Sequence, residues 1–137
     1  MRKRRNFKRG RPVPGKERLP RPVYRGKHFV YRITVNGVPY IGYTSRSPYT
    51  RLAEHLENAR NGSKGKLYNA LRKYEHDHLF EIVEEFDSEY NALCREILLI
   101  AECSNTLNMS PGGEGRSMRL ERIVLPDGSS VIKRRAR

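Results

Sequence analysis

The sequence lacks most of the features that mark secreted or membrane-spanning proteins. Its 137 residues include no tryptophan and only two cysteines, Cys94 and Cys103. Two cysteines form neither a disulfide framework nor a zinc cluster, so we expect reduced thiols in or near the core of a cytosolic protein. The longest apolar run, at 97–101, is too short for a transmembrane helix, which needs about 18 apolar residues. The basic N-terminal residues are followed by charges and prolines, so the sequence predicts no secretory signal.

Acidic residues are also in the minority, and the excess of positive charge lies at the two ends of the chain. The sequence has 28 Lys and Arg against 15 Asp and Glu, a net charge of +13. Residues 1–28 contain twelve basic residues and one acid, and residues 116–137 contain seven basic residues and two acids. Residues 29–115 hold nine basic and twelve acidic residues, so this segment has the charge balance of an ordinary globular domain. The length fits one such domain.

The first 27 residues have the composition of a mobile, basic arm. They contain four prolines and few apolar side chains, and so cannot bury enough surface to offset the entropy lost on ordering. Basic segments of this kind bind nucleic-acid phosphates by releasing counterions, although a solubilising tail or a contact with another acidic partner would have the same composition. The candidate phosphate contacts in the arm are Arg2, Lys3, Arg4, Arg5, Lys8 and Arg9.

The hydrophobic pattern of the middle segment predicts a small α+β domain. Strand-like segments flank Asn36-Gly37, a strong hairpin signal, and Ser47-Pro48 is a typical helix start. The expected elements are strands at 28–35 and 38–44, helices at 47–60 and 65–74, a strand at 80–86, and a helix from 87 or 88 to about 103. We therefore expect a three-stranded antiparallel sheet flanked by helices over residues 28–115.

The basic C-terminal segment, 116–137, predicts a β-hairpin. Two short strand-like segments flank the turn signature Pro-Asp-Gly at 126–128. A two-stranded hairpin is barely stable alone, so it either packs on the core or becomes ordered on a ligand. Lys133, Arg134 and Arg135 make its second strand a further candidate for phosphate contacts.

One carboxylate interrupts the apolar pattern of the last helix. Glu96 lies mid-helix, three residues after Leu93 and four before Ile100, at the border of the apolar face. A carboxylate there loses hydration unless it gains a cation or hydrogen bonds. Glu96 is either a boundary residue or an ion-pair partner of Arg95 or Arg51, or else it is a metal ligand or an acid/base group.

Further polar residues lie on the first hairpin and on the helix that follows it. Tyr31 and Tyr40 lie on strands joined by a tight turn and can face the same side of the sheet, although strand tyrosines usually serve packing. Gly42 within a strand indicates a bulge or a close backbone approach. Arg51 and His55 are four residues apart, and so share one face of the helix.

The order of these residues resembles the GIY-YIG nuclease family, in particular its small phage-type and homing-type members. Residues 40–42 are a YIG triplet, and the triplet ending at Tyr31 stands where the first half of the signature is expected, with phenylalanine and valine in place of glycine and isoleucine. Asn108 precedes a Gly-Gly-x-Gly stretch, so the resemblance extends over about residues 28–115. Lys64 and Lys66 stand in the loop where some homing members have a second histidine.

The resemblance implies a metal-dependent DNA endonuclease that hydrolyses phosphodiester bonds. Glu96 would hold Mg²⁺ or Mn²⁺, a hard cation suited to a carboxylate, waters and a phosphate oxygen. Tyr31 would act as general base or orient the attacking water, and because a free tyrosine has a pKa of about 10, a neighbouring cation or His55 must assist it. Tyr40 would complete the hydrogen bonds around the water and the phosphate.

The remaining implied roles belong to the first helix and the last loop. Arg51 would stabilise charge on the non-bridging phosphate oxygens. His55 would hydrogen-bond Tyr31 or the phosphate. Asn108 would position Glu96 or the loop through its side-chain amide.

The expected partner is double-stranded DNA, contacted through its phosphates. Arg46 and Tyr49, at the entrance of the first helix, are candidate contacts, or else solvated surface residues. No helix-turn-helix, zinc finger or other sequence reader is recognisable, so specificity would be weak or would come from DNA shape or a partner protein. One carboxylate-bound metal cuts one strand at a time, so a double-strand cut would need a dimer or a reorientation on the DNA.

Two alternatives stay open at this point. A basic nucleic-acid-binding protein without catalytic activity would have the same charge, although it would not explain the joint presence of the two tyrosines, Arg51, His55, Glu96 and Asn108. A nuclease could serve homing, restriction, repair or the degradation of host or competitor DNA, and the short chain without a reader domain favours a phage or mobile element. We expect a cytoplasmic protein with no membrane association, in the bacterial host if a phage encodes it.

Overall fold

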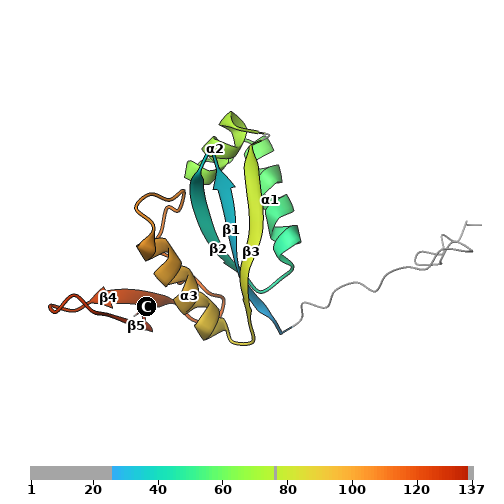
Figure 1. Ribbon diagram of the computed structural model, residues 1–137. Coiled ribbons are helices and arrows are strands. Elements are labelled where there is room, and N and C mark those ends of the chain that lie inside the picture. The colour runs from blue at the N-terminus through green and yellow to red at the C-terminus, as the bar shows by residue number, and fades with distance from the viewer. Residues whose placement is uncertain (1–25, 76, 136–137) are drawn as a thin grey trace, which may run out of the picture.

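The computed structural model describes residues 26–75 and 77–135. Its elements, in order, are β1 (His28–Val35), β2 (Val38–Thr44), α1 (Pro48–Arg60), α2 (Lys66–Lys73), β3 (His78–Phe86), α3 (Glu89–Glu102), β4 (Leu120–Val124) and β5 (Ser130–Arg134) (Figure 1). The predicted α+β class is confirmed, including the C-terminal hairpin. The arm residues Arg2, Lys3, Arg4, Arg5, Lys8 and Arg9 lie outside the described residues.

Strand β1 lies at the centre of a three-stranded antiparallel sheet with the order β2-β1-β3. The predicted Asn36-Gly37 turn joins β1 to β2, and in this hairpin Tyr31 is paired with Gly42. The register of β1 with β3 shifts between Val30 and Tyr31, which marks a β-bulge at this point. The irregular part of the sheet therefore lies beside Tyr31.

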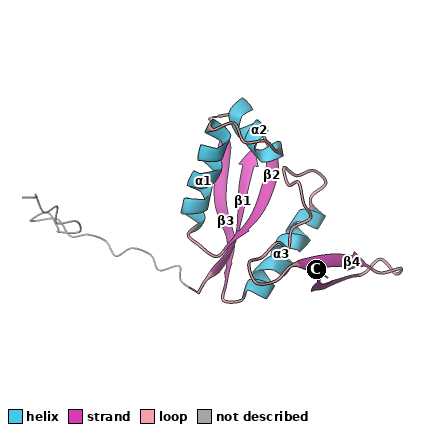
Figure 2. Ribbon diagram, turned by 180° about the vertical axis from the view of Figure 1, so that it is seen from behind, coloured by secondary structure: helices cyan, strands magenta, loops and turns pink. Residues whose placement is uncertain are grey.

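Helices cover both faces of the sheet, with α1 and α2 on one side and α3 on the other (Figure 1), and Figure 2 shows the same arrangement from behind. The buried residues of the α1–α2 side are Tyr31, Ile33, Val35, Ala59, Leu67 and Leu71. Those of the α3 side are Val30, Ile41 and Ala92. Successive side chains of a strand point to opposite faces, so Val30 packs under α3 whereas Tyr31 faces α1.

The starts of α1 and α3 follow the sequence signals at their N-caps. Helix α1 begins at Pro48, whose missing N–H costs nothing in the first turn, and Ser47 occupies the N-cap without a side-chain capping bond. Helix α3 begins after Ser88, whose hydroxyl accepts a hydrogen bond from the backbone N–H of Asn91 at 3.3 Å. The strand-to-helix turn before α1 thus places its first residues close to the end of β2.

The root of the β4–β5 hairpin packs on α3. Leu120, the first residue of β4, is 2% exposed and shares an apolar cluster with Leu93 and Ile97 of α3. Its backbone N–H donates to the carbonyl of Gly113 at 2.9 Å. Of the two possibilities left open by the sequence, the hairpin therefore packs on the core, and it is tied to the loop that follows α3.

Both cysteines lie on or beside α3. Cys94 and Cys103, on α3 and directly after it, are free thiols at half-buried positions. Within the described ranges, every helix is too short or too polar to cross a lipid bilayer.

Candidate active site

The ring of Tyr31 lies directly over Gly42 on the neighbouring strand. A Cβ atom at position 42 would be 2.7 Å from Cε2 of Tyr31, and closer still to Cζ and the hydroxyl oxygen. Glycine is therefore required at this position for the phenol to cross β2. The close backbone approach expected at Gly42 is the approach of this aromatic side chain.

The hydroxyl of Tyr31 and the imidazole of His55 form a buried hydrogen-bonded pair. The Tyr31 hydroxyl oxygen is 2.8 Å from Nε2 of His55, and each residue is 1% exposed. On the other side of the ring, Nδ1 of His55 lies 3.2 Å from the hydroxyl of Tyr68 on α2. Tyr40 packs edge-on against the imidazole, with ring centroids 5.4 Å apart. Two strands and two helices thus meet at one phenol–imidazole pair.

Burial shifts the pKa values of this pair in opposite directions. It raises the pKa of Tyr31 well above its usual range, helped by Tyr40 and Glu96, while the positive charge of Arg51 opposes the increase. Burial also raises the pKa of Tyr40. Burial and the nearby Arg51 lower the pKa of His55 to about 4. At neutral pH the pair is therefore an un-ionised phenol and a neutral imidazole, one nitrogen of which can accept a proton.

Arg51 lies one helical turn before His55, at the edge of the same cluster. Its side chain is 31% exposed, and its Nη1 donates to Oε1 of Glu54 at 3.1 Å. Arg46 donates two further hydrogen bonds to the same carboxylate, at 2.8 and 2.9 Å. The bonds from Arg46 and Arg51 lower the pKa of Glu54 to about 2, so the carboxylate is charged. Glu54 therefore holds Arg51 from the solvent side.

Glu96 is the only buried carboxylate among the described residues, with 8% of its surface exposed. Its Oε1 accepts a hydrogen bond from the backbone N–H of Gly113 at 2.9 Å. Burial raises the pKa of Glu96 to about 7, against the opposing effect of the Gly113 bond. The ion-pair alternatives do not hold, because Arg95 is 3.5 Å from Glu84 and Arg51 pairs with Glu54.

The donor set around Glu96 fits a hard divalent cation. The described residues contain no group of three or more His, Cys, Asp or Glu side chains placed to hold a metal ion. Zn²⁺ takes three or four protein nitrogen or sulfur ligands, whereas Mg²⁺ keeps several waters and binds through one or two carboxylates and substrate phosphates. A single carboxylate, fixed through one oxygen by Gly113, suits Mg²⁺ or Mn²⁺ with water and phosphate completing the coordination.

Asn108 fastens the loop after α3 to the edge of β2. Its Oδ1 accepts from the backbone N–H of Ile41 at 2.9 Å, and its Nδ2 donates to the Ile41 carbonyl at 2.7 Å. The side-chain amide thus pairs with β2 as a neighbouring strand would. The backbone N–H of Leu107 adds a bond to the carbonyl of Pro39 at 2.8 Å. Asn108 holds the loop and β2 together, and its amide is not bonded to Glu96.

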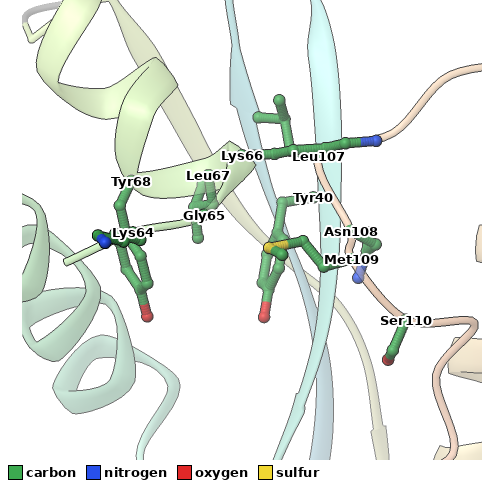
Figure 3. A pocket seen from close by; sticks show the side chains of 10 residues that line it. All are labelled: Tyr40, Lys64, Gly65, Lys66, Leu67, Tyr68, Leu107, Asn108, Met109 and Ser110. Atoms are coloured by element: carbon green, nitrogen blue, oxygen red, sulfur yellow. The ribbon is translucent and has the colours of Figure 1, made fainter.

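A cavity of about 210 Å³ opens beside Tyr40. Figure 3 shows Tyr40 between the start of α2 and the loop with Asn108, its hydroxyl pointing the same way as that of Tyr68. Lys64 and Lys66, which stand where some family members have a second histidine, also line the cavity. The cavity is therefore lined both by two tyrosines of the tyrosine cluster (Tyr31, Tyr40, His55 and Tyr68) and by two cationic side chains.

The candidate DNA contacts outside this cluster lie at three places on the surface. Tyr49 is 58% exposed, with its ring centroid 5.6 Å from that of Phe80. Arg46 is bound by Glu54 near the start of α1, as described above. On and after β5, Lys133 is exposed, Arg134 donates to the carbonyl of Ser117 at 3.4 Å, and Arg135 pairs with Glu114. Arg46 and Tyr49 border the site indirectly, because Glu54 also bonds to Arg51 and the ring of Phe80 also packs on Tyr31.

Three contributors to the site were not singled out by the sequence: Glu54, Tyr68 and Gly113. Glu54 follows Arg51 by three residues, a spacing that favours an ion pair on a helix, and so could have been found. Tyr68 stands beside the apolar stripe of α2, and no local pattern indicates that it reaches His55. Gly113 has a φ of 84°, a conformation that favours glycine, and lies in the Gly-Gly-x-Gly stretch noted above.

Comparison with protein-family models gives a match to the GIY-YIG catalytic domain over residues 27–108. The match covers more than half of the 137 residues and includes both tyrosines, Arg51, His55, Glu96 and Asn108. Comparisons with curated proteins and with solved structures give no match. The sheet order, the Tyr31–Gly42 approach and the family match agree, and the chain belongs to the GIY-YIG nuclease family.

Proposed function

We propose that the protein is a metal-dependent DNA endonuclease that hydrolyses phosphodiester bonds. The observation that carries the proposal is the buried pair of Tyr31 and His55 next to Arg51. The carboxylate of Glu96 acts electrostatically on both Tyr31 and Tyr40. A proton acceptor, a fixed cation and a carboxylate around one phenol are the groups that phosphodiester hydrolysis needs.

Tyr31 and His55 form the proton path in this proposal. The attacking water gives its proton to the Tyr31 hydroxyl oxygen, as that hydroxyl gives its own proton to Nε2 of His55. This step requires the tautomer of His55 with hydrogen on Nδ1, which the hydroxyl of Tyr68 stabilises by accepting that hydrogen. The negative charge of a bound phosphate would raise the pKa of His55, opposing the burial and the Arg51 charge that lower it in the free protein.

The other residues of the cluster bind and position the phosphate. Arg51, held by Glu54, would stabilise charge on the non-bridging oxygens. Tyr40 has a raised pKa, and so remains a hydrogen-bond donor at neutral pH. Glu96 would hold Mg²⁺ or Mn²⁺, which when bound supplies positive charge at the phosphate and the leaving oxygen. Asn108 keeps the loop after α3 fixed to β2.

The proposed substrate is double-stranded DNA, held mainly through its phosphates. The basic residues of the arm, 1–27, and Lys133, Arg134 and Arg135 of the C-terminal segment, 116–137, would supply most of the affinity, with the nuclease domain between these segments at 28–115. Lys64 and Lys66 lie beside the Tyr40 cavity, where the backbone flanking the cleaved bond would pass. Specificity would come from DNA shape, a dimer or a partner protein, as expected of a compact nuclease from a phage or mobile element acting in the cytoplasm.

Conversion of supercoiled plasmid tests this proposal. The protein is incubated with plasmid in Mg²⁺ and in EDTA, and the Glu96→Gln variant is incubated in Mg²⁺ beside it. We expect nicked and then linear DNA in Mg²⁺ alone, and a rate at least about 100-fold lower for Glu96→Gln, with DNA binding retained. Glu102→Gln removes a charge from the exposed end of the same helix and should cut at the parent rate.

The outcomes separate the two functions that the sequence left open. Cutting in EDTA, or by Glu96→Gln at the parent rate, would show that the metal assignment is wrong. Tight binding to DNA without cutting in any divalent metal would favour the non-catalytic nucleic-acid-binding protein.

A further inference from the structure

A second, strongly basic cavity lies at the root of the β4–β5 hairpin, outside the residues that match the family. It has a volume of about 770 Å³, and the chain segment 115–119 forms one of its walls. Four arginines line it, namely Arg116, Arg119, Arg134 and Arg135. Arginine presents a planar fork of donors that matches phosphate oxygens, so four arginines around one cavity suit a phosphate ligand.

The positive charge of this arginine cavity is only partly balanced by the protein. Arg119 and Arg135 share a single carboxylate, that of Glu114, with Arg119 at 3.8 Å. Arg134 donates to a backbone carbonyl at 3.4 Å, and within the described part of the chain it forms no ion pair. Arg116 is exposed and has neither an ion pair nor a side-chain hydrogen bond to the described residues. At least two guanidinium groups are therefore available to an anion from solution.

The arginine cavity lies close to the candidate active site. Its wall begins at Gly115, two residues after Gly113, whose N–H holds Glu96, and two residues span at most about 7 Å. Arg116 and Glu96 also act on the same side chain, because Glu96 raises and Arg116 lowers the pKa of Tyr43. Burial is the main cause that raises this pKa, to about 12. The Arg116 guanidinium and the Glu96 carboxylate thus both lie within electrostatic range of the Tyr43 hydroxyl.

We infer that the arginine cavity binds the DNA backbone next to the phosphodiester bond that is cleaved in the active site with Glu96. This inference rests on the proposed function. Successive nucleotides of one strand rise by about 3.4 Å, so a cavity that begins within about 7 Å of Gly113 takes a phosphate a few nucleotides from the cut. Arg116 and Arg134 are its principal phosphate contacts. The cavity sets where the cleaved bond lies along the DNA, because the hairpin root is fixed to α3 through Leu120.

The salt dependence of DNA binding tests the inference without requiring cleavage. The full chain is titrated onto a fluorescent DNA duplex in EDTA over a range of salt concentrations. The slope of log K against log salt is negative, and Arg116→Gln and Arg134→Gln should each reduce its magnitude by about 0.9, and the double variant by about 1.8. Arg122→Gln is the matched control, because Arg122 is exposed on β4, outside the cavity, and its Nε donates to the Ser130 hydroxyl. Its slope should equal that of the parent.

Three results would overturn the inference. The first is a parent-like slope for the double variant, and the second is an equal decrease for Arg122→Gln. The third is a larger loss of affinity for an RNA duplex than for DNA, which would make RNA the ligand. These slopes do not depend on catalysis, so a parent that binds but never cuts contradicts the proposed function alone.

A second experiment tests the position of the cavity relative to the cleaved bond. Single neutral methylphosphonate linkages are placed one at a time on either side of the cleavage site. A linkage that lowers kcat/KM for the parent, but not for the variant with both Arg116→Gln and Arg134→Gln, identifies the phosphate bound by these two arginines. If every such linkage lowers kcat/KM equally in both proteins, the cavity does not contact the DNA near the cut.

Discussion

Glu96→Gln is expected to stabilise the folded protein above neutral pH while removing its activity. In the fold, burial raises the pKa of Glu96 from 4.5 to about 7, so its ionisation is penalised relative to the unfolded chain. The gap between these values corresponds to about 3 kcal/mol of unfolding free energy, at about 1.4 kcal/mol per pH unit. Glutamine keeps the shape and an oxygen that accepts from the Gly113 N–H, but has no charge to bury.

The pH window follows from the direction of this shift. Between pH 4.5 and about 7 the unfolded carboxyl is ionised while the folded one still holds its proton, so the parent loses stability as the pH rises. Below that window Glu96 is protonated in both the folded and the unfolded protein, so parent and variant should be equally stable. Above it, the variant should be more stable by about 3 kcal/mol.

Urea unfolding at intervals between pH 4 and pH 8, in EDTA, measures this difference. His55 has its own lowered pKa, but it titrates in both proteins, so the difference between them isolates Glu96. Glu102→Gln, at an exposed position on the same helix, should show no such pH-dependent gain. Mg²⁺ should stabilise the parent and not Glu96→Gln. A difference that stays constant from pH 4 to pH 8 would refute the assignment of Glu96 as a buried, proton-binding carboxylate.

Four further predictions concern the same cluster. Gly42→Ala should lower the unfolding free energy by about 1–3 kcal/mol in urea and also slow plasmid cleavage, because its methyl group collides with Tyr31. Tyr31→Phe keeps the ring over Gly42 but leaves Nε2 of His55 without its partner, so plasmid cleavage should fall at least about 100-fold while the unfolding free energy falls by only about 1–3 kcal/mol. Asn108→Ala leaves the N–H and carbonyl of Ile41 unpaired, which should cost about 1–3 kcal/mol and speed hydrogen exchange at Ile41. Below pH 7, kcat/KM in Mg²⁺ should rise about tenfold per pH unit and level off above it, since protonated Glu96 holds no cation; a flat profile would contradict this.

The sequence by itself determined the elements and their order. Alternating apolar residues, the Asn36-Gly37 turn, Pro48 at a helix start and Ser88 at an N-cap are local signals, and the strands and helices begin close to where these signals place them. Local signals suffice because strand periodicity, turn conformation and capping each depend on a few neighbouring residues. The spacing of Tyr31, Tyr40 and the residues after them also indicated the family.

Only the tertiary structure decided which polar groups meet. Glu96 accepts its hydrogen bond from a residue 17 positions away, and Asn108 binds a strand residue 67 positions away. Whether Glu96 bordered the surface or lay in the core depended on the loop with Gly112 and Gly113 lying against it, and helical periodicity does not predict this contact. The arginine cavity arises in the same way, because residues 115–119 and 134–135 come together only when β4 and β5 pair. Burial and long-range pairing set the charges of a site, and a linear pattern specifies neither.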